Sequence, residues 1–166
     1  MTEIPEQERI IKWLIDRCTQ YILYSEELPT VHFLAPSYPA LGPGESWIWD
    51  EFLSKSDLKF MGMFYNVRVG PGAPVSPEDP EVIKRMWKDL TRLRIDAVGL
   101  RSDELWIFEV KWRAGKTMLG QLEGYGIHIL RELRPKLKVV LAGVCKEVDP
   151  NYVDIFRMKA IRIFIV

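Results

Sequence analysis

The sequence predicts one α/β domain. Two apolar runs with strand character, residues 94–100 and 104–112, follow each other in the chain, and residues 58–69 form a third such run. Apolar residues at helical spacing predict a helix over residues 6–24, and a second helix is expected over about residues 117–133. A chain of 166 residues is also long enough to bury a proper core without disulfides.

The other elements follow in chain order. Residues 25–44 are rich in Pro and Gly but also apolar, which indicates an ordered loop or arm. A short helix or turn is expected over residues 46–53. After a turn at residues 70–72, an N-cap serine, an early proline and first-turn acids predict a helix from residue 76 to about 90.

Strands over residues 138–144 and 161–166 complete the domain. The whole chain, residues 1–166, is expected to form this single domain. Within it, residues 1–45 contribute the N-terminal helix and the Pro/Gly-rich arm, and residues 46–166 contribute the core.

Composition excludes several classes of protein. Hydrophobic residues make up 48% of the chain and charged residues 28%, as in soluble globular proteins, and no stretch is long and apolar enough to span a membrane. Residues 1–6 lack the basic start of a signal peptide, and Cys18 and Cys145 lack metal-ligand spacing, so we expect thiols in a reducing cytoplasm. The formal net charge is zero, so nucleic-acid affinity requires a local basic patch.

Three charged residues interrupt the apolar runs. Asp96 lies in the first run, Glu109 and Lys111 lie in the second, and a short polar connection between the runs suits a hairpin. Strand side chains alternate between faces, so Glu109 and Lys111 share one face. The opposite face, which we expect to be the core side, holds Trp106, Phe108, Val110 and Trp112. Burying charge costs several kcal/mol unless the charge is paired or bound to a metal, so this pattern suggests chemistry.

The ordered set of Asp96, hairpin and Glu109-Val110-Lys111 resembles the PD-(D/E)xK nuclease superfamily, which has the restriction-endonuclease-like fold. Gln121 and Tyr125, four residues apart on one helix face, look like the Q-x-x-x-Y element of its RecB-like branch. The resemblance covers about residues 66–144, and it implies a mixed central sheet flanked by helices, with an extra N-terminal helix and arm. The chain departs from the compact family pattern by a helical insertion between Gly70 and Arg94.

The resemblance also implies a divalent-metal nuclease. Asp96, Glu109 and the Val110 carbonyl would hold Mg²⁺ or Mn²⁺, which prefer oxygen ligands. Lys111 would orient the attacking water and stabilise negative charge. Gln121 would position the water or a phosphate oxygen, and Tyr125 would contact the DNA backbone or shape the site.

The family usually adds one acid from a helix before the first core strand. Glu51 is the candidate for that acid and Glu8 is the alternative.

DNA is the expected partner, bound mainly through its phosphates. The candidate phosphate-binding residues are Arg92, Arg94, Arg113, Lys116, Arg131 and Arg134. Because no sequence-reading module is visible, we expect structure-directed or low-specificity cleavage in repair, recombination or phage DNA processing. The setting would be the cytoplasm of a bacterium or a phage-infected cell, with the chain acting as a homo-oligomer or in a larger DNA-processing complex, away from membranes.

Two other hypotheses stay open at this point. The chain can be a non-catalytic restriction-like domain used for DNA binding or assembly. It can also be a structural α/β protein in which Glu109 and Lys111 form an exposed pair on a solvated sheet face. Trp112 fits either core packing or stacking on a base. The separation of the Asp96 and Glu109 carboxylates distinguishes these hypotheses.

Overall fold

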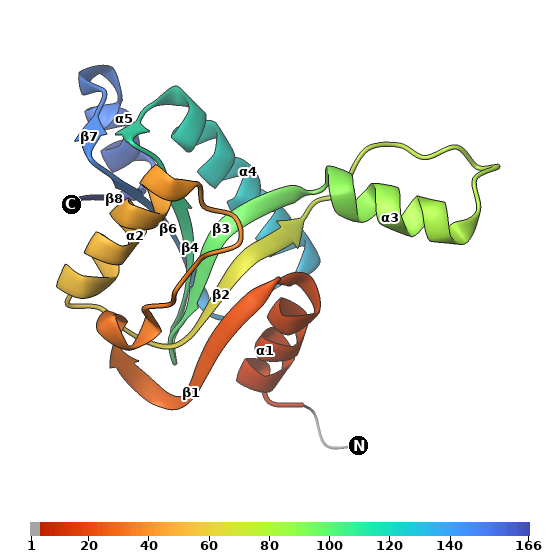
Figure 1. Ribbon diagram of the computed structural model, residues 1–166, viewed down its shortest axis with the longest axis horizontal. Coiled ribbons are helices and arrows are strands. Elements are labelled where there is room, and N and C mark those ends of the chain that lie inside the picture. Colours follow the sequence, from red (N-terminus) through yellow and green to blue (C-terminus); the bar gives the residue numbers. More distant parts are fainter. Residues whose placement is uncertain (1–3) are drawn as a thin grey trace.

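The computed structural model describes residues 4–166 and has a six-stranded mixed sheet between two layers of helices (Figure 1). The strand order is β1-β2-β3-β4-β6-β8. The strands of this sheet are β1 (Gln20–Pro29), β2 (Lys59–Val69), β3 (Leu93–Leu100), β4 (Glu104–Val110), β6 (Lys138–Cys145) and β8 (Arg162–Ile165). The helices are α1 (Glu6–Arg17), α2 (Pro43–Lys55), α3 (Glu81–Thr91), α4 (Lys116–Glu132) and α5 (Val153–Met158). Two short strands, β5 (Arg113–Ala114) and β7 (Glu147–Val148), pair separately.

The sheet changes from antiparallel to parallel at β4. Strands β1 to β4 form an antiparallel meander, whereas β4, β6 and β8 run parallel. Parallel neighbours need a crossover connection, and α4 supplies it between β4 and β6 while α5 lies between β6 and β8. The confirmed part of the predicted fold is therefore an α/β domain with a mixed sheet flanked by helices.

Both faces of the sheet are buried. On one face, Leu105 and Ile107 of β4 pack in a core with α1, α4 and Phe156 of α5. On the other face, Trp106 and Phe108 pack in an aromatic core with α2. The prediction that the Trp106 side faces the core is correct, but the Leu105 side is buried as completely. Glu109, which shares the face of Leu105 and Ile107, is consequently carried into an apolar layer.

Most predicted strands and the helix at about residues 117–133 match observed elements, and the N-terminal region is the main correction. The helix predicted over residues 6–24 ends at Arg17, and the chain then forms β1, which includes Tyr21 and Ile22. These are good strand formers, and pairing with β2 outweighs the helical spacing that they continue. Residues 25–44 are likewise not a separate arm, because β1 and a 3₁₀ turn at Thr30–Phe33 occupy their first part.

Two smaller differences also matter. The helix predicted from residue 76 begins five residues later, at Glu81, directly after Pro80. Trp112, expected on the core side, is 56% exposed. Its exposure follows from the end of β4 at Val110: two residues later the chain has left the regular sheet, so the alternation that would have buried Trp112 no longer applies.

The described residues contain no helix that is both long and apolar enough to cross a membrane. Cys145 is buried and Cys18 is half-buried, and both are free thiols. Residues 1–3, which belong to the segment expected not to be a signal peptide, lie outside the described part of the chain.

Candidate active site

The site is built where β3 and β4 separate. The two strands pair from Leu100 and Leu105 as far as Ala97 and Phe108, and the pairing stops there. Asp96 and Glu109 are the next residues on each strand, so they lie on both sides of the opening. In place of a backbone partner, the Val110 N–H donates to Asp96 Oδ2 at 2.8 Å. The Asp96 carboxylate thus bridges the gap between the strands.

The other edge of β4 stays paired and fixes the position of Glu109. Glu109 lies opposite Gly143 of β6, and the Lys111 N–H continues the ladder by donating to the Val144 carbonyl at 3.0 Å. A Cβ atom at Gly143 would lie 2.3 Å from the sulfur of Met118 on α4. The glycine therefore allows the first turns of α4 to pack closely over the strand that carries Glu109.

Both carboxylates are buried. Asp96 is 8% exposed and Glu109 is 2% exposed. Lys111 Nζ lies 3.1 Å from Glu109 Oε1, and about a quarter of the lysine side chain reaches solvent. The hypothesis of an exposed Glu109–Lys111 pair on a solvated sheet face is therefore wrong, because the acid of that pair is almost completely enclosed.

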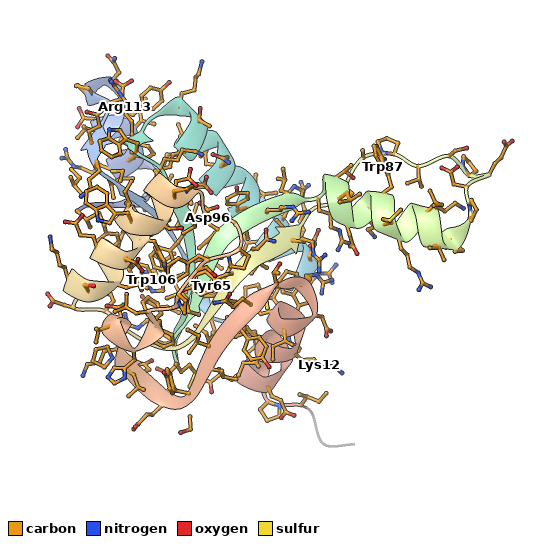
Figure 2. All side chains as sticks on the ribbon, in the orientation of Figure 1. Lys12, Tyr65, Trp87, Asp96, Trp106 and Arg113 are labelled. Atoms are coloured by element: carbon orange, nitrogen blue, oxygen red, sulfur yellow. The ribbon has the colours of Figure 1, made fainter. Side chains whose placement is uncertain are left out.

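Helix α4 adds two polar side chains. Gln121 Nε2 donates to the Tyr125 hydroxyl at 3.3 Å, and that hydroxyl lies beside the Glu109 carboxylate. The i, i+4 spacing that identified these residues in the sequence does place them on one helix face. Asp96, Glu109, Lys111, Gln121 and Tyr125 thus come together from β3, β4, the end of β4 and α4 (Figure 2 shows Asp96 among these elements).

Burial shifts both acids toward their neutral forms, and the charge of Glu109 adds to the shift at Asp96. Burial, followed by the charge of Glu109, raises the pKa of Asp96 from 3.8 to about 8. Burial also raises the pKa of Glu109, against the charge of Lys111, which lowers it. The pKa of the Tyr125 hydroxyl is raised by burial and by the charges of Glu109 and Asp96. Two acids held close in an apolar layer are the kind of perturbed group that marks functional sites.

Two oxygen atoms in this cluster lack partners. Among the residues that the structure describes, Glu109 Oε2 and Gln121 Oε1 are buried and have no hydrogen-bond partner. Buried acceptors of this kind are rare, because leaving one unpaired costs free energy. These oxygens are suited to bind a cation or a hydrogen-bond donor from a ligand.

The donor set fits Mg²⁺ or Mn²⁺ in chemistry. These ions prefer oxygen ligands, and Mg²⁺ is commonly held by one or two carboxylates while it keeps several waters. Asp96 and Glu109 supply two carboxylates. Within residues 4–166, no group of three or more His, Cys, Asp or Glu side chains is arranged to hold a metal ion. The cluster therefore offers a two-carboxylate site.

The predicted helix acid, Glu51, does not join the cluster. It lies on α2, where it forms ion pairs with Lys55, at 2.6 Å, and with Lys146. Glu8, the alternative, lies on α1 and is exposed. The α2 acid that acts on the site is Glu45, whose charge raises the pKa of Asp96. Glu45 also accepts the Gly42 N–H at the start of α2, at 3.2 Å.

Sequence reasoning missed Glu45 because it had the helix begin at residue 46. The signal was present: Gly42-Pro43 before an acid is a helix start, with proline in the first turn and glutamate three residues after the N-cap.

Replacing Glu45 by Gln is expected to lower the pKa of Asp96, because one negative charge is removed while the side chain can still accept the Gly42 N–H. Glu51→Gln is the matched control on the same helix and is expected to leave that pKa unchanged. Carbon-13 NMR titration of the Asp96 carboxyl measures both. Equal shifts in the two variants would show that Glu45 has no special position.

The six cations predicted to bind phosphate do not form one arc. Arg94 and Lys116 are exposed and lie near the cluster in the chain, at the start of β3 and of α4. Arg92 contacts Asp89 at 4.0 Å. Arg113 lies near Glu147 and Asp149, at 3.8 and 3.7 Å, and apart from Asp96 in Figure 2.

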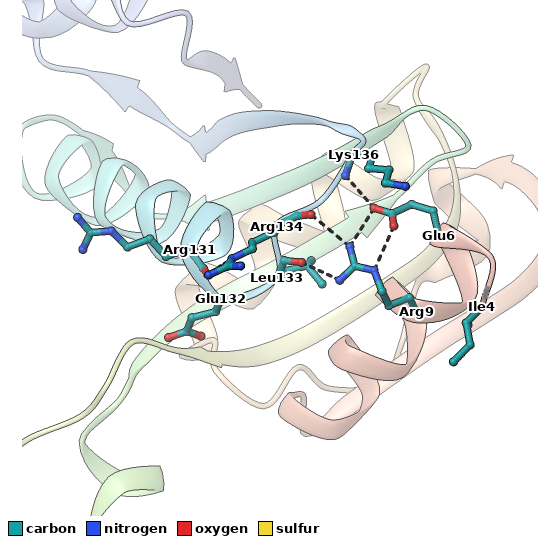
Figure 3. Close-up of a pocket in the computed structure, with 8 residues that line it drawn as sticks. All are labelled: Ile4, Glu6, Arg9, Arg131, Glu132, Leu133, Arg134 and Lys136. Atoms are coloured by element: carbon teal, nitrogen blue, oxygen red, sulfur yellow. Dashed lines mark hydrogen bonds and ion pairs between the residues drawn. The ribbon is translucent and has the colours of Figure 1, made fainter. Parts of the chain in front are cut away.

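Arg131 and Arg134 belong to the opposite end of α4. They line a hollow with Arg9, which donates from α1 to the Leu133 carbonyl at 2.7 Å (Figure 3). Arg131 is ten residues beyond Gln121, about 15 Å along a helix. This hollow is consequently a helix-end contact, remote from the acids.

No protein-family model matches the chain, and no curated protein or solved structure matches it. The residues of the site are thus the only basis for a functional conclusion.

Proposed function

We propose that this chain is a divalent-metal-dependent DNA nuclease with a restriction-endonuclease-like fold. The observation that carries the proposal is the buried pair of Asp96 and Glu109 at the opening between β3 and β4, with Lys111 Nζ 3.1 Å from Glu109. A buried acid pair beside a lysine is expensive to maintain for structure alone. The same residues are those that the PD-(D/E)xK pattern picks out in the sequence.

Each residue has a distinct role in this proposal. Asp96 and Glu109, with the Val110 carbonyl, would hold Mg²⁺ or Mn²⁺. When bound, the ion supplies polarisation of the scissile phosphate and a lowered pKa of water. Lys111 would donate from Nζ to the attacking water and to the phosphate oxygen on which charge develops. Gln121 would use its free Oε1 to orient the water, and Tyr125 would hold Gln121 and Glu109 in place.

The DNA would be held through its phosphates by Arg94 and Lys116, exposed cations at the start of β3 and of α4. Because the described elements include no separate sequence-reading module, cleavage would be structure-directed or of low specificity. The setting would be DNA repair, recombination or phage DNA processing, in the cytoplasm of a bacterium or a phage-infected cell.

The competing candidate is a non-catalytic module for DNA binding or assembly. It is favoured by the finding that no three acid, histidine or cysteine side chains of residues 4–166 are grouped to hold a metal. The test is cleavage of linear, nicked, branched and single-stranded DNA at millimolar Mg²⁺ or Mn²⁺. We expect products with at least one substrate and none in excess EDTA. Binding of DNA without cleavage of any substrate would support the module, and cleavage in EDTA would contradict the metal requirement.

A further inference from the structure

The segment between β2 and β3 forms an arm that projects from the domain (Figure 1). Residues 70–80 run outward, and α3 returns toward the sheet, so Glu81 lies toward the tip and Thr91 lies at the base. At the base, the Ala73 N–H donates to Thr91 Oγ1 at 2.7 Å and joins the outgoing loop to the helix. Figure 2 shows Trp87 on this arm, apart from the rest of the domain.

One side of α3 is an uncovered apolar stripe. No residue of α3 is buried, and the stripe residues are 42–75% exposed. Counted from Val82, the other four stripe residues follow after one, four, five and eight positions. This spacing places all five on one side of the helix, opposite the charged residues. The stripe consists of Val82, Ile83, Met86, Trp87 and Leu90. Contiguous apolar surface of this kind marks an interaction site on a protein.

An exposed leucine lies at the base of the arm. Leu93 is 45% exposed and reaches Gly124, where a Cβ atom would lie 3.9 Å from it. Leu93 therefore adds an exposed apolar side chain at the base of the arm.

Charge is distributed unevenly along the arm. The tip carries Glu78, Asp79 and Glu81, and Lys84, 3.4 Å from Glu81, offsets part of their charge. The base carries arginines from three elements, Arg17, Arg68 and Arg92, and Asp89 lies 3.9 Å from Arg68 and 4.0 Å from Arg92. The arginines lie close enough together that the charges of Arg92 and Arg68 add to burial in lowering the pKa of Arg17. Asp16 and Glu132 oppose that effect on the pKa of Arg17, and the exposed Lys88 and Arg94 add positive charge at the base. The tip is thus negative, and the base keeps a surplus of positive charge.

We propose that a second copy of this chain covers the stripe, with the two α3 helices packed antiparallel about a two-fold axis. An antiparallel pair brings the acidic tip of each arm to the arginine-rich base of the other. The same arrangement lays each tip beside the exposed Leu93 of the other copy. One surface then serves both partners, as two-fold symmetry requires. DNA would not cover an apolar stripe, and the acidic tip would repel it.

The first test is the mass of the full chain in solution. Sedimentation equilibrium from low to high micromolar concentration is expected to show a dimer. The double variant Met86→Glu with Leu90→Glu should raise the dimer Kd at least about 100-fold, because it would place charge at the centre of the interface. Met158→Glu is the matched control, since Met158 is 86% exposed but lies on α5, and it should remain dimeric. Circular dichroism checks that all variants fold.

The second test is the direction of the helices. Val82 and Leu90 lie four residues on either side of Met86, so an antiparallel pair places Met86 against itself and Val82 against Leu90. Met86→Cys is expected to give a disulfide-linked dimer on mild oxidation, and Val82→Cys is expected to link to Leu90→Cys in a mixture. The parent chain, with Cys18 and Cys145 only, is the control.

Three results would overturn the proposal. One is a monomer at every concentration, and another is a dimer that the Met86→Glu, Leu90→Glu variant leaves intact. The third is a Val82→Cys chain that links efficiently to itself, which would mean a parallel pair. If a monomeric protein binds duplex DNA and this double variant does not, DNA covers the stripe instead.

Discussion

The rate of DNA cleavage is expected to fall at least about 100- to 1,000-fold when Lys111 is replaced by Ala, the range typical for loss of one charge-stabilising donor. Under the proposed function, Lys111 Nζ is the cation held against the acid pair, 3.1 Å from Glu109. Its removal takes away both water orientation and stabilisation of the developing charge. The loss should appear mainly in kcat, because phosphate contacts elsewhere continue to hold the DNA.

The fold should survive this substitution. Lys111 is partly exposed, and Glu109 can take up a proton once its partner is absent, because its pKa is already raised by burial. Far-UV circular dichroism and a melting curve check this point. Lys12→Ala is the control, since Lys12 is an exposed lysine of α1, apart from Asp96 in Figure 2. If the Lys111→Ala protein cleaves DNA within tenfold of the wild-type rate, Lys111 has no catalytic role.

The central residues of this site could be predicted from the sequence because local periodicity determines which side chains share a face. Glu109 and Lys111 lie two residues apart in a strand, and Gln121 and Tyr125 lie four apart in a helix. These spacings determine which side chains share a face, whatever the surrounding topology. The hairpin between β3 and β4 is also local. It brings Asp96 to the strand that carries Glu109.

The residues that were missed depend on contacts between distant parts of the chain. Glu51 and Glu45 are both acids of α2, and only the packing of that helix decides which one approaches Asp96. Glu51 is held by Lys146, 95 residues later in the chain, and no local pattern predicts that pair. Arg131 is on the same helix as Gln121 and Arg134 lies just beyond its end, but both follow Gln121 by several turns. Spacing alone therefore overestimated how many cations surround the site.

The N-terminal strand was missed for a related reason. Residues 18–22 continue the helical spacing of α1, and they also suit a strand. The choice is made by β2, whose edge would be unpaired without β1. Backbone groups at a sheet edge need partners. The groups that pair with β1 belong to residues 59–69, about 40 positions further along the chain, so no local pattern reveals them.

Replacing Asp96 by Asn should raise the melting temperature of the metal-free protein at pH 8. The wild-type carboxyl has a pKa of about 8 when folded and about 3.8 when unfolded. Between these values the folded state retains a proton that the unfolded state releases, so stability falls as pH rises from about 4 to 8. Above pH 8 the full cost of the charge is present.

Asn removes this cost and keeps the structure of the opening. Its side chain cannot ionise, and its carbonyl oxygen can still accept the Val110 N–H that Asp96 accepts now. The two proteins should therefore have nearly equal melting temperatures at pH 4 and diverge as the pH is raised. Asp57→Asn, an exposed acid before β2, is the control and should follow the wild type at every pH.

Divalent metal should reverse the comparison. A cation that binds the folded site stabilises it by mass action, so millimolar Mn²⁺ should raise the melting temperature of the wild type and of Asp57→Asn. The Asp96→Asn protein has lost one of the two buried carboxylates and should not respond. An equal Mn²⁺ shift in Asp96→Asn and wild type would place the cation elsewhere. Burial of the charged Asp96 would then lower the stability of the fold with no metal to offset it, and the proposed nuclease would lose its metal ligand.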